Sequence, residues 1–302
     1  MSRGSARAHP AHRHMILPAV LFALSAAMVF GLNMHIQNKG LDDTDELTGA
    51  FVSVAAMAAV FWALSPLFVD FAWFRAHALW YFAASGLVIP ALGQRLQIAS
   101  IRLVGPAISS AINGFLPVFA ILPAVLVLGE TFGLQATLGL TIMIGGVLFT
   151  ALYKGKIKRG WPLWALLIPL TASFARGLSP VVNKFGYAEV DSPFFATLIM
   201  STVSTVVLIL ALAFRRTPAR TPAGRKGVLW FALSGLLNGL GILCVNLAVS
   251  RGDVSIVTPL MMASPVFALG FGAYVFKREV IGLNHVVLVA AIVTGSVLIV
   301  TR

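Results

Sequence analysis

Charged side chains are scarce in this sequence. Only 11% of its 302 residues are Asp, Glu, Lys or Arg, whereas 59% are apolar and the mean hydropathy is +0.92. Because so few polar groups cannot form a hydrated surface around an apolar core, a soluble globular domain is excluded. The scarcity predicts a protein embedded in a lipid bilayer, with apolar runs near the length of about 20 residues that crosses it.

Acidic side chains are scarcer still, and none lies in the middle of an apolar run. All ten fall in predicted loops or at predicted helix ends: Asp42, Asp43, Asp45, Glu46, Asp70, Glu130, Glu189, Asp191, Asp253 and Glu279. Proton-coupled carriers commonly hold a titratable group inside the membrane. His35 lies in the first apolar run, and histidine titrates near neutral pH. Two interpretations stay open for His35, a proton-coupling group and a packed or interfacial histidine.

Cysteine is almost absent, since Cys244 is the only one and lies in an apolar run. One cysteine excludes an intrachain disulfide and a cysteine metal cluster. The sequence also lacks the phosphate-binding pattern Gly-x-x-x-x-Gly-Lys-Ser/Thr, the zinc pattern His-Glu-x-x-His and the hydrolase pattern Gly-x-Ser-x-Gly. We therefore expect no enzymatic activity, no cofactor and no bound metal.

Basic residues give a net charge of +12, but they form short clusters between apolar runs. This pattern is typical of residues that set membrane topology and contact lipid headgroups, and it argues against nucleic acid as a partner. Over the predicted loops, thirteen Lys and Arg residues lie on one face and six on the other. The positive-inside rule would then place both termini outside the cytoplasm.

Ten apolar runs follow a basic tail at residues 1–14, and their length predicts helices because a lipid-exposed segment must satisfy its own backbone. The predicted transmembrane helices are 15–37, 47–69, 77–100, 103–128, 133–153, 161–185, 192–214, 227–249, 254–276 and 281–301. The predicted fold is an all-α polytopic membrane protein.

The second half of the chain repeats the first. Pro-Val-Phe-Ala begins at Pro117 and again at Pro265, and Glu-x-x-Gly-Leu begins at Glu130 and again at Glu279. We interpret residues 15–153 and 154–302 as two copies of one five-helix unit. An odd number of helices per copy inverts the second copy in the membrane, which predicts a substrate site near the midplane where the copies meet.

Polar side chains inside the predicted helices are the candidates for that site. The substrate-binding hypothesis names Asn33, Gln37, Gln94, Gln97, Asn113, Arg176, Asn183 and Asn246. The alternative for each amide is a hydrogen bond that only holds helices together. Arg176 is costly to bury, and a guanidinium favours a carboxylate-bearing solute through paired hydrogen bonds. Arg95 shares this interpretation, although its long side chain can also reach the membrane interface.

The repeated motif itself is interpreted as architectural. Its prolines each remove a backbone donor and kink a helix, so that the helix can bow around a cavity. Glu130 and Glu279 precede the last helix of each half, where a carboxylate can cap free N–H groups of the helix that follows.

These doubled motifs resemble the EamA-type transporters of the drug/metabolite transporter superfamily. The resemblance rests on the stretches Pro117 to Glu130 and Pro265 to Glu279, on Gly133 and Gly282, and on the Gly-Leu to Asn-Lys segments at residues 31–39 and 177–184. It implies a ten-helix carrier of the bacterial inner membrane, often an exporter of amino acids or other small metabolites. The resemblance also implies that both termini are cytoplasmic, which is the opposite of the orientation that the loop charges predict.

The sequence thus predicts a secondary transporter of a small polar or amphipathic metabolite, amino-acid-like or organic-acid-like, that works by alternating access and favours efflux. A multidrug or cation exporter and a non-transporting membrane scaffold or receptor remain alternatives. The expected partners are the small-molecule substrate and the lipid bilayer. The sequence does not distinguish a monomer from a dimer.

Overall fold

The structure is a computed structural model that describes residues 10–92, 96, 100, 103–104, 108, 112–153, 162–215, 224–276 and 282–301. Within this part of the chain every regular element is helical and no strand occurs, which confirms the all-α prediction.

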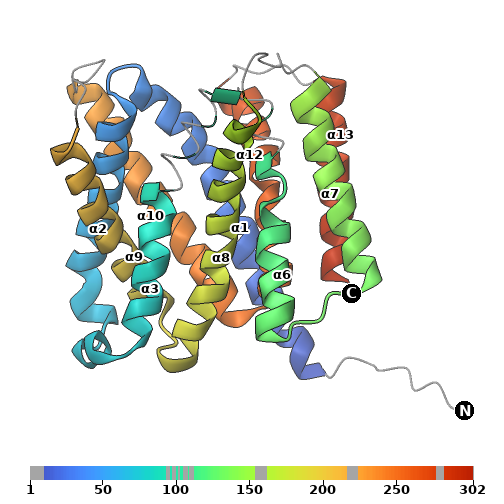
Figure 1. Cartoon of the computed structure of the whole chain (residues 1–302), viewed down its shortest axis with the longest axis horizontal. Helices are drawn as coiled ribbons and strands as arrows, with labels where there is room; N and C mark the ends of the chain where they lie inside the picture. The colour runs from blue at the N-terminus through green and yellow to red at the C-terminus, as the bar shows by residue number, and fades with distance from the viewer. Residues whose placement is uncertain are drawn as a thin grey trace, which may run out of the picture.

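The first half contains α1 (Pro10–Leu41), α2 (Glu46–Phe68), the short turn η1 (Phe71–Arg75), α3 (Ala78–Gly86), η2 (Leu87–Leu92), α6 (Leu116–Leu128) and α7 (Leu134–Tyr153). The second half contains η3 (Leu163–Leu166), α8 (Leu167–Glu189), α9 (Pro193–Ala213), α10 (Arg225–Arg251), α11 (Val254–Leu260), η4 (Met261–Ala263), α12 (Ser264–Gly270), η5 (Phe271–Val275) and α13 (Leu283–Val300). The start of α1 and the end of α13 lie at the same end of the bundle (Figure 1).

Seven of these helical segments are long and apolar enough to cross a membrane, and three shorter apolar helices accompany them. The shorter ones are Ala78–Ile89, Leu116–Leu128 and Leu134–Thr150. The chain is therefore an integral multi-pass membrane protein. The beginning of the predicted helix at 103–128 lies largely outside the described residues.

The first helix is longer than predicted at both ends, because α1 runs from Pro10 to Leu41 instead of 15 to 37. At its C-terminal end, the polar stretch Asn33–Lys39 continues the helix rather than leaving it. Polar side chains do not stop a helix whose backbone bonds are already made within the segment.

Helices of the two halves pack in matching pairs. Helix α1 contacts α10 and α12, whereas α8 makes the corresponding contacts with α3 and α6. Helix α2 packs against α9, and α7 packs against α13 at one edge of the bundle (Figure 1). Each half therefore places its first helix against the third and fourth helices of the other half.

Two glycines bring the central helices into close contact. A Cβ atom at Gly31 on α1 would lie 2.7 Å from the backbone nitrogen of Ala268 on α12. A Cβ atom at Gly177 on α8 would lie 3.0 Å from the nitrogen of Ala120 on α6. Ala120 and Ala268 are the alanines of the two Pro-Val-Phe-Ala motifs. The same close contact thus occurs twice, once from each half.

Three helices are interrupted near the middle of the bundle. Ile89 has an extended backbone, with φ −124° and ψ 127°, and is followed by Pro90, which disfavours helical geometry in the residue before it. A turn at residues 114–115 precedes α6, and the 3₁₀ turn η4 separates α11 from α12. Irregular backbone at this depth is tolerated where it borders a cavity or protein.

The carboxylates at the helix ends cap helices of the opposite half. Glu130 accepts hydrogen bonds from the backbone N–H groups of Val254 and Ser255, at 2.9 and 2.8 Å. The interpretation that Glu130 caps the helix after it is therefore wrong, because it caps α11 instead. Gly129, with φ 71°, ends α6 in the left-handed conformation.

Two more carboxylates, near the ends of α1 and α8, also cap helices of the opposite half. Glu189 accepts from the N–H groups of His77 and Ala78 at the start of α3, at 3.1 and 2.7 Å. Asp43 accepts from the N–H of Gly227 at the start of α10, at 3.1 Å. Since a helix N-terminus is positively polarised, each carboxylate ties the two halves together.

Candidate functional site

A cavity of about 540 Å³ lies between the two halves. Its described lining consists of Phe30, Asn33, Met34, Gln37, Ile89, Asn113, Gly114, Leu116, Pro117, Val147, Arg176, Asn238, Ile242, Thr258, Met261, Met262, Ser264 and Pro265. The volume falls within the range of about 300–1,000 Å³ that is usual for small-molecule sites. Both copies of the Pro-Val-Phe-Ala motif border the cavity, through Pro117 and Pro265.

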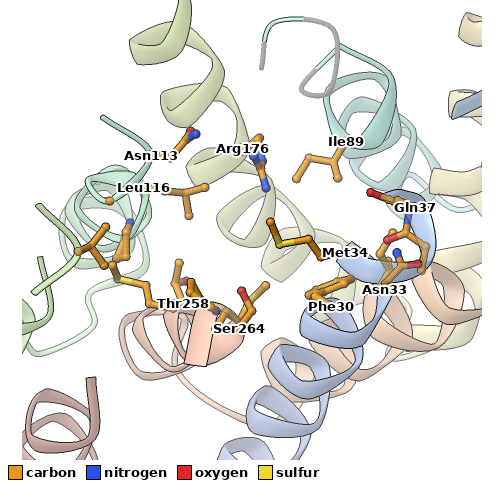
Figure 2. A pocket seen from close by; sticks show the side chains of 18 residues that line it. Phe30, Asn33, Met34, Gln37, Ile89, Asn113, Leu116, Arg176, Thr258 and Ser264 are labelled. Carbon is orange, nitrogen blue, oxygen red and sulfur yellow. The ribbon is translucent and has the colours of Figure 1, made fainter. Parts of the chain in front are cut away.

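Arg176 is the one charged side chain in the described lining. It comes from the middle of α8 and reaches into the space between Leu116 and Ile89 (Figure 2). The structure gives it no hydrogen bond or ion pair in the described part of the chain. A guanidinium at such a position costs about 2.5–3.5 kcal/mol on insertion scales, so an uncompensated one indicates a functional site.

Asn113 lies beside Arg176 in the cavity wall (Figure 2). Its side-chain oxygen accepts a hydrogen bond of 2.9 Å from the Ser173 hydroxyl, one turn before Arg176 on α8. This bond joins the two halves at the site. The N-terminus of α6 follows at Leu116, so the positive end of that helix also borders the cavity.

Helix α1 supplies the opposite wall through Phe30, Asn33, Met34 and Gln37 (Figure 2). These residues share one face because they are spaced by three or four along the helix. Asn33 is only 3% exposed, and its side-chain oxygen has no hydrogen-bond partner in the described part of the chain. A buried amide oxygen without a partner is unfavourable, so a bound solute or water would stabilise it.

Several lining residues were not proposed from the sequence. Asn238 on α10, Thr258 and Ser264 line the cavity but are not among the residues predicted from the sequence. Thr258 directly precedes Pro259, and Ser264 directly precedes Pro265. The predicted proline kinks could therefore have pointed to both hydroxyl residues.

The structure places Asn183 and Asn246 away from the described cavity lining, in a buried cluster within the second half. The amide nitrogen of Asn183 donates to the Asn246 oxygen at 3.2 Å, and the Asn246 nitrogen donates to the Thr197 hydroxyl at 2.9 Å. The cluster joins α8, α9 and α10. Its bonds match the alternative given for these amides, which is a helix-joining role.

His35 lies next to the cavity but does not belong to its described lining. Its Nε2 atom donates a hydrogen bond of 2.8 Å to the carbonyl oxygen of Ala268, and its ring stacks on Phe276 at a centroid distance of 4.7 Å. Because a carbonyl only accepts, this bond fixes the proton on Nε2. The remaining candidates Gln94 and Gln97, and also Arg95, lie outside the described residues.

No group of three or more His, Cys, Asp or Glu side chains arranged for a metal ion occurs in the part of the chain that the structure describes.

Comparisons with known proteins agree with this architecture. A solved chain described as "Crystal structure of protein" is similar over 93% of this chain and 95% of its own, with a TM-score of 0.77 and 15% sequence identity. At that identity the similarity is one of fold. No curated protein matches the sequence. Two segments, residues 17–152 and 162–301, match the EamA-like transporter family, which confirms the resemblance seen in the doubled motifs. The chain belongs to the EamA-like transporter family, a family of membrane transporters, and carries two copies of its repeat.

Proposed function

We propose that the protein is a secondary transporter that moves a small polar or amphipathic metabolite, amino-acid-like or organic-acid-like, by alternating access. The observation that carries the proposal is the cavity between the halves, because both halves line it and Arg176 stands in it without a described partner. Inverted-repeat carriers bind their substrates near the midplane between their repeats.

The proposed topology is ten membrane-crossing helices in two inverted units of five. The paired contacts support it, since Gly31 meets α12 as Gly177 meets α6. The start of α1 and the end of α13 also lie at one end of the bundle, as an even number of crossings requires (Figure 1). Such a pair of units can rock between two mirror-related arrangements that open the cavity to opposite sides.

Efflux across a bacterial-type inner membrane is the proposed direction and location. The membership in a transporter family supports a membrane carrier, and the resemblance stated above favours export. The alternative of a cation exporter would need a negative group in the cavity, and the described lining offers none. The alternative of a scaffold gives no reason for a partly buried arginine in the cavity without a described partner.

Proton coupling through His35 remains a prediction. The hydrogen bond to Ala268 joins α1 to α12, so protonation of Nδ1 would place a charge at the contact between the halves. We expect His35→Gln to abolish pH-gradient-driven flux while leaving solute exchange without a gradient. Unchanged gradient-driven flux in His35→Gln vesicles would rule out this coupling.

A screen of solutes tests the proposal as a whole. Purified protein in detergent is first tested for ligand-induced thermal shifts with amino acids, organic acids, nucleosides and cationic dyes, because a ligand stabilises the state that it binds. Compounds that raise the melting temperature are then tested for exchange in proteoliposomes, with protein-free liposomes as the control. Exchange of at least one compound is expected. If a broad panel showed neither thermal shifts nor exchange, a scaffold would become the better explanation.

A further inference from the structure

The described lining of the cavity contains one positive charge and no negative charge. Arg176 is the charged residue of the described lining, and none of the chain's ten Asp and Glu residues is in that lining. The described acidic residues lie at helix ends or between helices, and Glu279 lies outside the described residues. The described lining therefore has a guanidinium that pairs with an anion and no carboxylate that pairs with an ammonium.

Three described carboxylates, Glu130, Glu189 and Asp43, are engaged at the helix ends. Both oxygens of Glu130 accept from the start of α11, and both oxygens of Glu189 accept from the start of α3. Asp43 accepts from the start of α10. These carboxylates therefore hold the halves together and are not in the described lining beside Arg176.

Polar groups near Arg176 favour a negative ligand as well. The N-terminus of α6, a helix of 13 residues, borders the cavity at Leu116 and adds the positive end of its dipole. The oxygen of Asn113, the amide next to Arg176, already accepts a hydrogen bond from Ser173. An ammonium group in this part of the cavity would meet like charge without a compensating carboxylate.

Besides Arg176 and the polar residues Asn33, Gln37, Asn113, Asn238, Thr258 and Ser264, the described lining is largely apolar. It includes Phe30, Met34, Ile89, Leu116, Val147, Ile242, Met261 and Met262. Thioether and aliphatic side chains adapt to different apolar shapes. A ligand that suits both parts has an anionic end and an apolar body.

We propose that the cavity selects small carboxylates with one negative charge, an apolar body and no amino group over zwitterionic amino acids of the same shape. This inference rests on the proposed transport function and specifies its substrate class. A single guanidinium matches a single carboxylate by paired hydrogen bonds. A doubly charged phosphate would leave one charge uncompensated in the cavity.

The test uses four compounds with one carbon skeleton and different charge: hydroxyisocaproate (anion), leucine (zwitterion), leucinamide (cation) and hydroxyisocaproamide (neutral). Hydroxyisocaproate differs from leucine only in a hydroxyl group that replaces the ammonium. Each compound is measured for thermal shift of the detergent-solubilised protein and for exchange in proteoliposomes. We expect hydroxyisocaproate to bind at least tenfold more tightly than leucine, and leucinamide to bind most weakly.

The variant Arg176→Gln separates charge from shape. It should weaken hydroxyisocaproate binding at least tenfold and leave the neutral amide unchanged, so that the preference disappears. Arg176→Lys keeps the charge without the forked geometry. Its affinity for hydroxyisocaproate should lie between those of the wild type and Arg176→Gln. Circular dichroism and size exclusion establish that each variant is folded.

Two results separate the failure of this inference from that of the function. Exchange of leucine or leucinamide that equals or exceeds that of hydroxyisocaproate would overturn the charge selection and leave a transporter. No exchange of any of the four compounds, or of the broader panel, would overturn the proposed function and the inference together.

Discussion

Two charged side chains at the helix ends are hydrogen-bonded within the fold, whereas the charged side chain in the centre of the bundle has no described partner. At the ends, Glu130 and Glu189 each accept two backbone N–H groups from a helix of the opposite half. In the centre, Arg176 lines the cavity without a described partner. The difference indicates which charges build the protein and which serve a solute. A charge that is fully hydrogen-bonded by the fold contributes to stability, whereas an uncompensated charge in a cavity needs a ligand.

The amides differ in whether they line the cavity. Asn183, two turns after Arg176 on α8, bonds to Asn246, and Asn246, one turn after Ile242 on α10, bonds to Thr197. Neither asparagine belongs to the described lining, although the side-chain oxygen of Asn183 also lacks a described partner. Asn33 lines the cavity, and its oxygen lacks a partner in the described part of the chain. Mutations at the two kinds of position should therefore change different quantities, and the following predictions test this.

The largest effect on stability is expected for Glu130→Ala. The substitution leaves the N–H groups of Val254 and Ser255 without their acceptor, at the start of a helix whose seven residues are all buried. We expect a loss of about 2–3 kcal/mol, seen as a lower unfolding temperature in detergent. The exposed Asp42, as Asp42→Ala, is the control and should change stability by less than about 0.5 kcal/mol. Equal effects of both substitutions would contradict the capping role.

The next effect is expected where the helices of the two halves touch. Gly177→Ala places a Cβ atom 2.8 Å from that of Phe119 and 3.0 Å from the nitrogen of Ala120. Overpacking of this kind costs about 1–3 kcal/mol. Gly145→Ala on α7 is the matched control, because a Cβ atom there has no neighbour within 4 Å. It should stabilise the helix by about 0.5–1 kcal/mol. Thermal unfolding of both variants should give shifts of opposite sign.

A smaller loss is expected for Asn246→Ala. It removes the partner of Asn183 and of Thr197 and should cost about 1 kcal/mol, near the values measured for polar contacts between membrane helices. Ligand charge preference should stay as in the wild type, since Asn246 is not in the described cavity lining. A changed preference among the four leucine-like compounds would indicate that Asn246 contributes to ligand binding.

The smallest effect concerns the loop end of the bundle and depends on pH. Burial alone would raise the pKa of Asp45, but hydrogen bonds from Thr48 and the Arg215 guanidinium, at 2.9 Å, lower that pKa below its ordinary value of 3.8. A carboxyl whose pKa is lower in the folded state stabilises the fold above pH 3.8, and this contribution is lost as the pH falls through the folded-state pKa. We expect less than about 1 kcal/mol. Unfolding temperatures of the wild type and Asp45→Asn should converge at acidic pH; a constant difference would contradict the assignment.

Much of the fold followed from composition and repetition, because lipid solvent permits few backbone solutions. The long apolar runs gave the helices, and the doubled Pro-Val-Phe-Ala motif gave the family. The site was less predictable, since helices that are apolar on most faces carry little periodic signal for the side that faces a cavity. Asn113 and Asn183 therefore looked alike in the sequence. The partner of Glu130 could not be inferred locally, because it lies 124 residues away in the other half.

The most direct measurement compares Glu130→Ala with Arg176→Gln by two readouts, the unfolding temperature and the affinity for hydroxyisocaproate relative to leucine. Glu130→Ala should unfold at lower temperature and keep the wild-type preference for the anion. Arg176→Gln should unfold at the wild-type temperature or above, because an uncompensated charge is removed, and should lose the preference at least tenfold. An Arg176→Gln protein that is less stable yet still prefers hydroxyisocaproate would contradict the account.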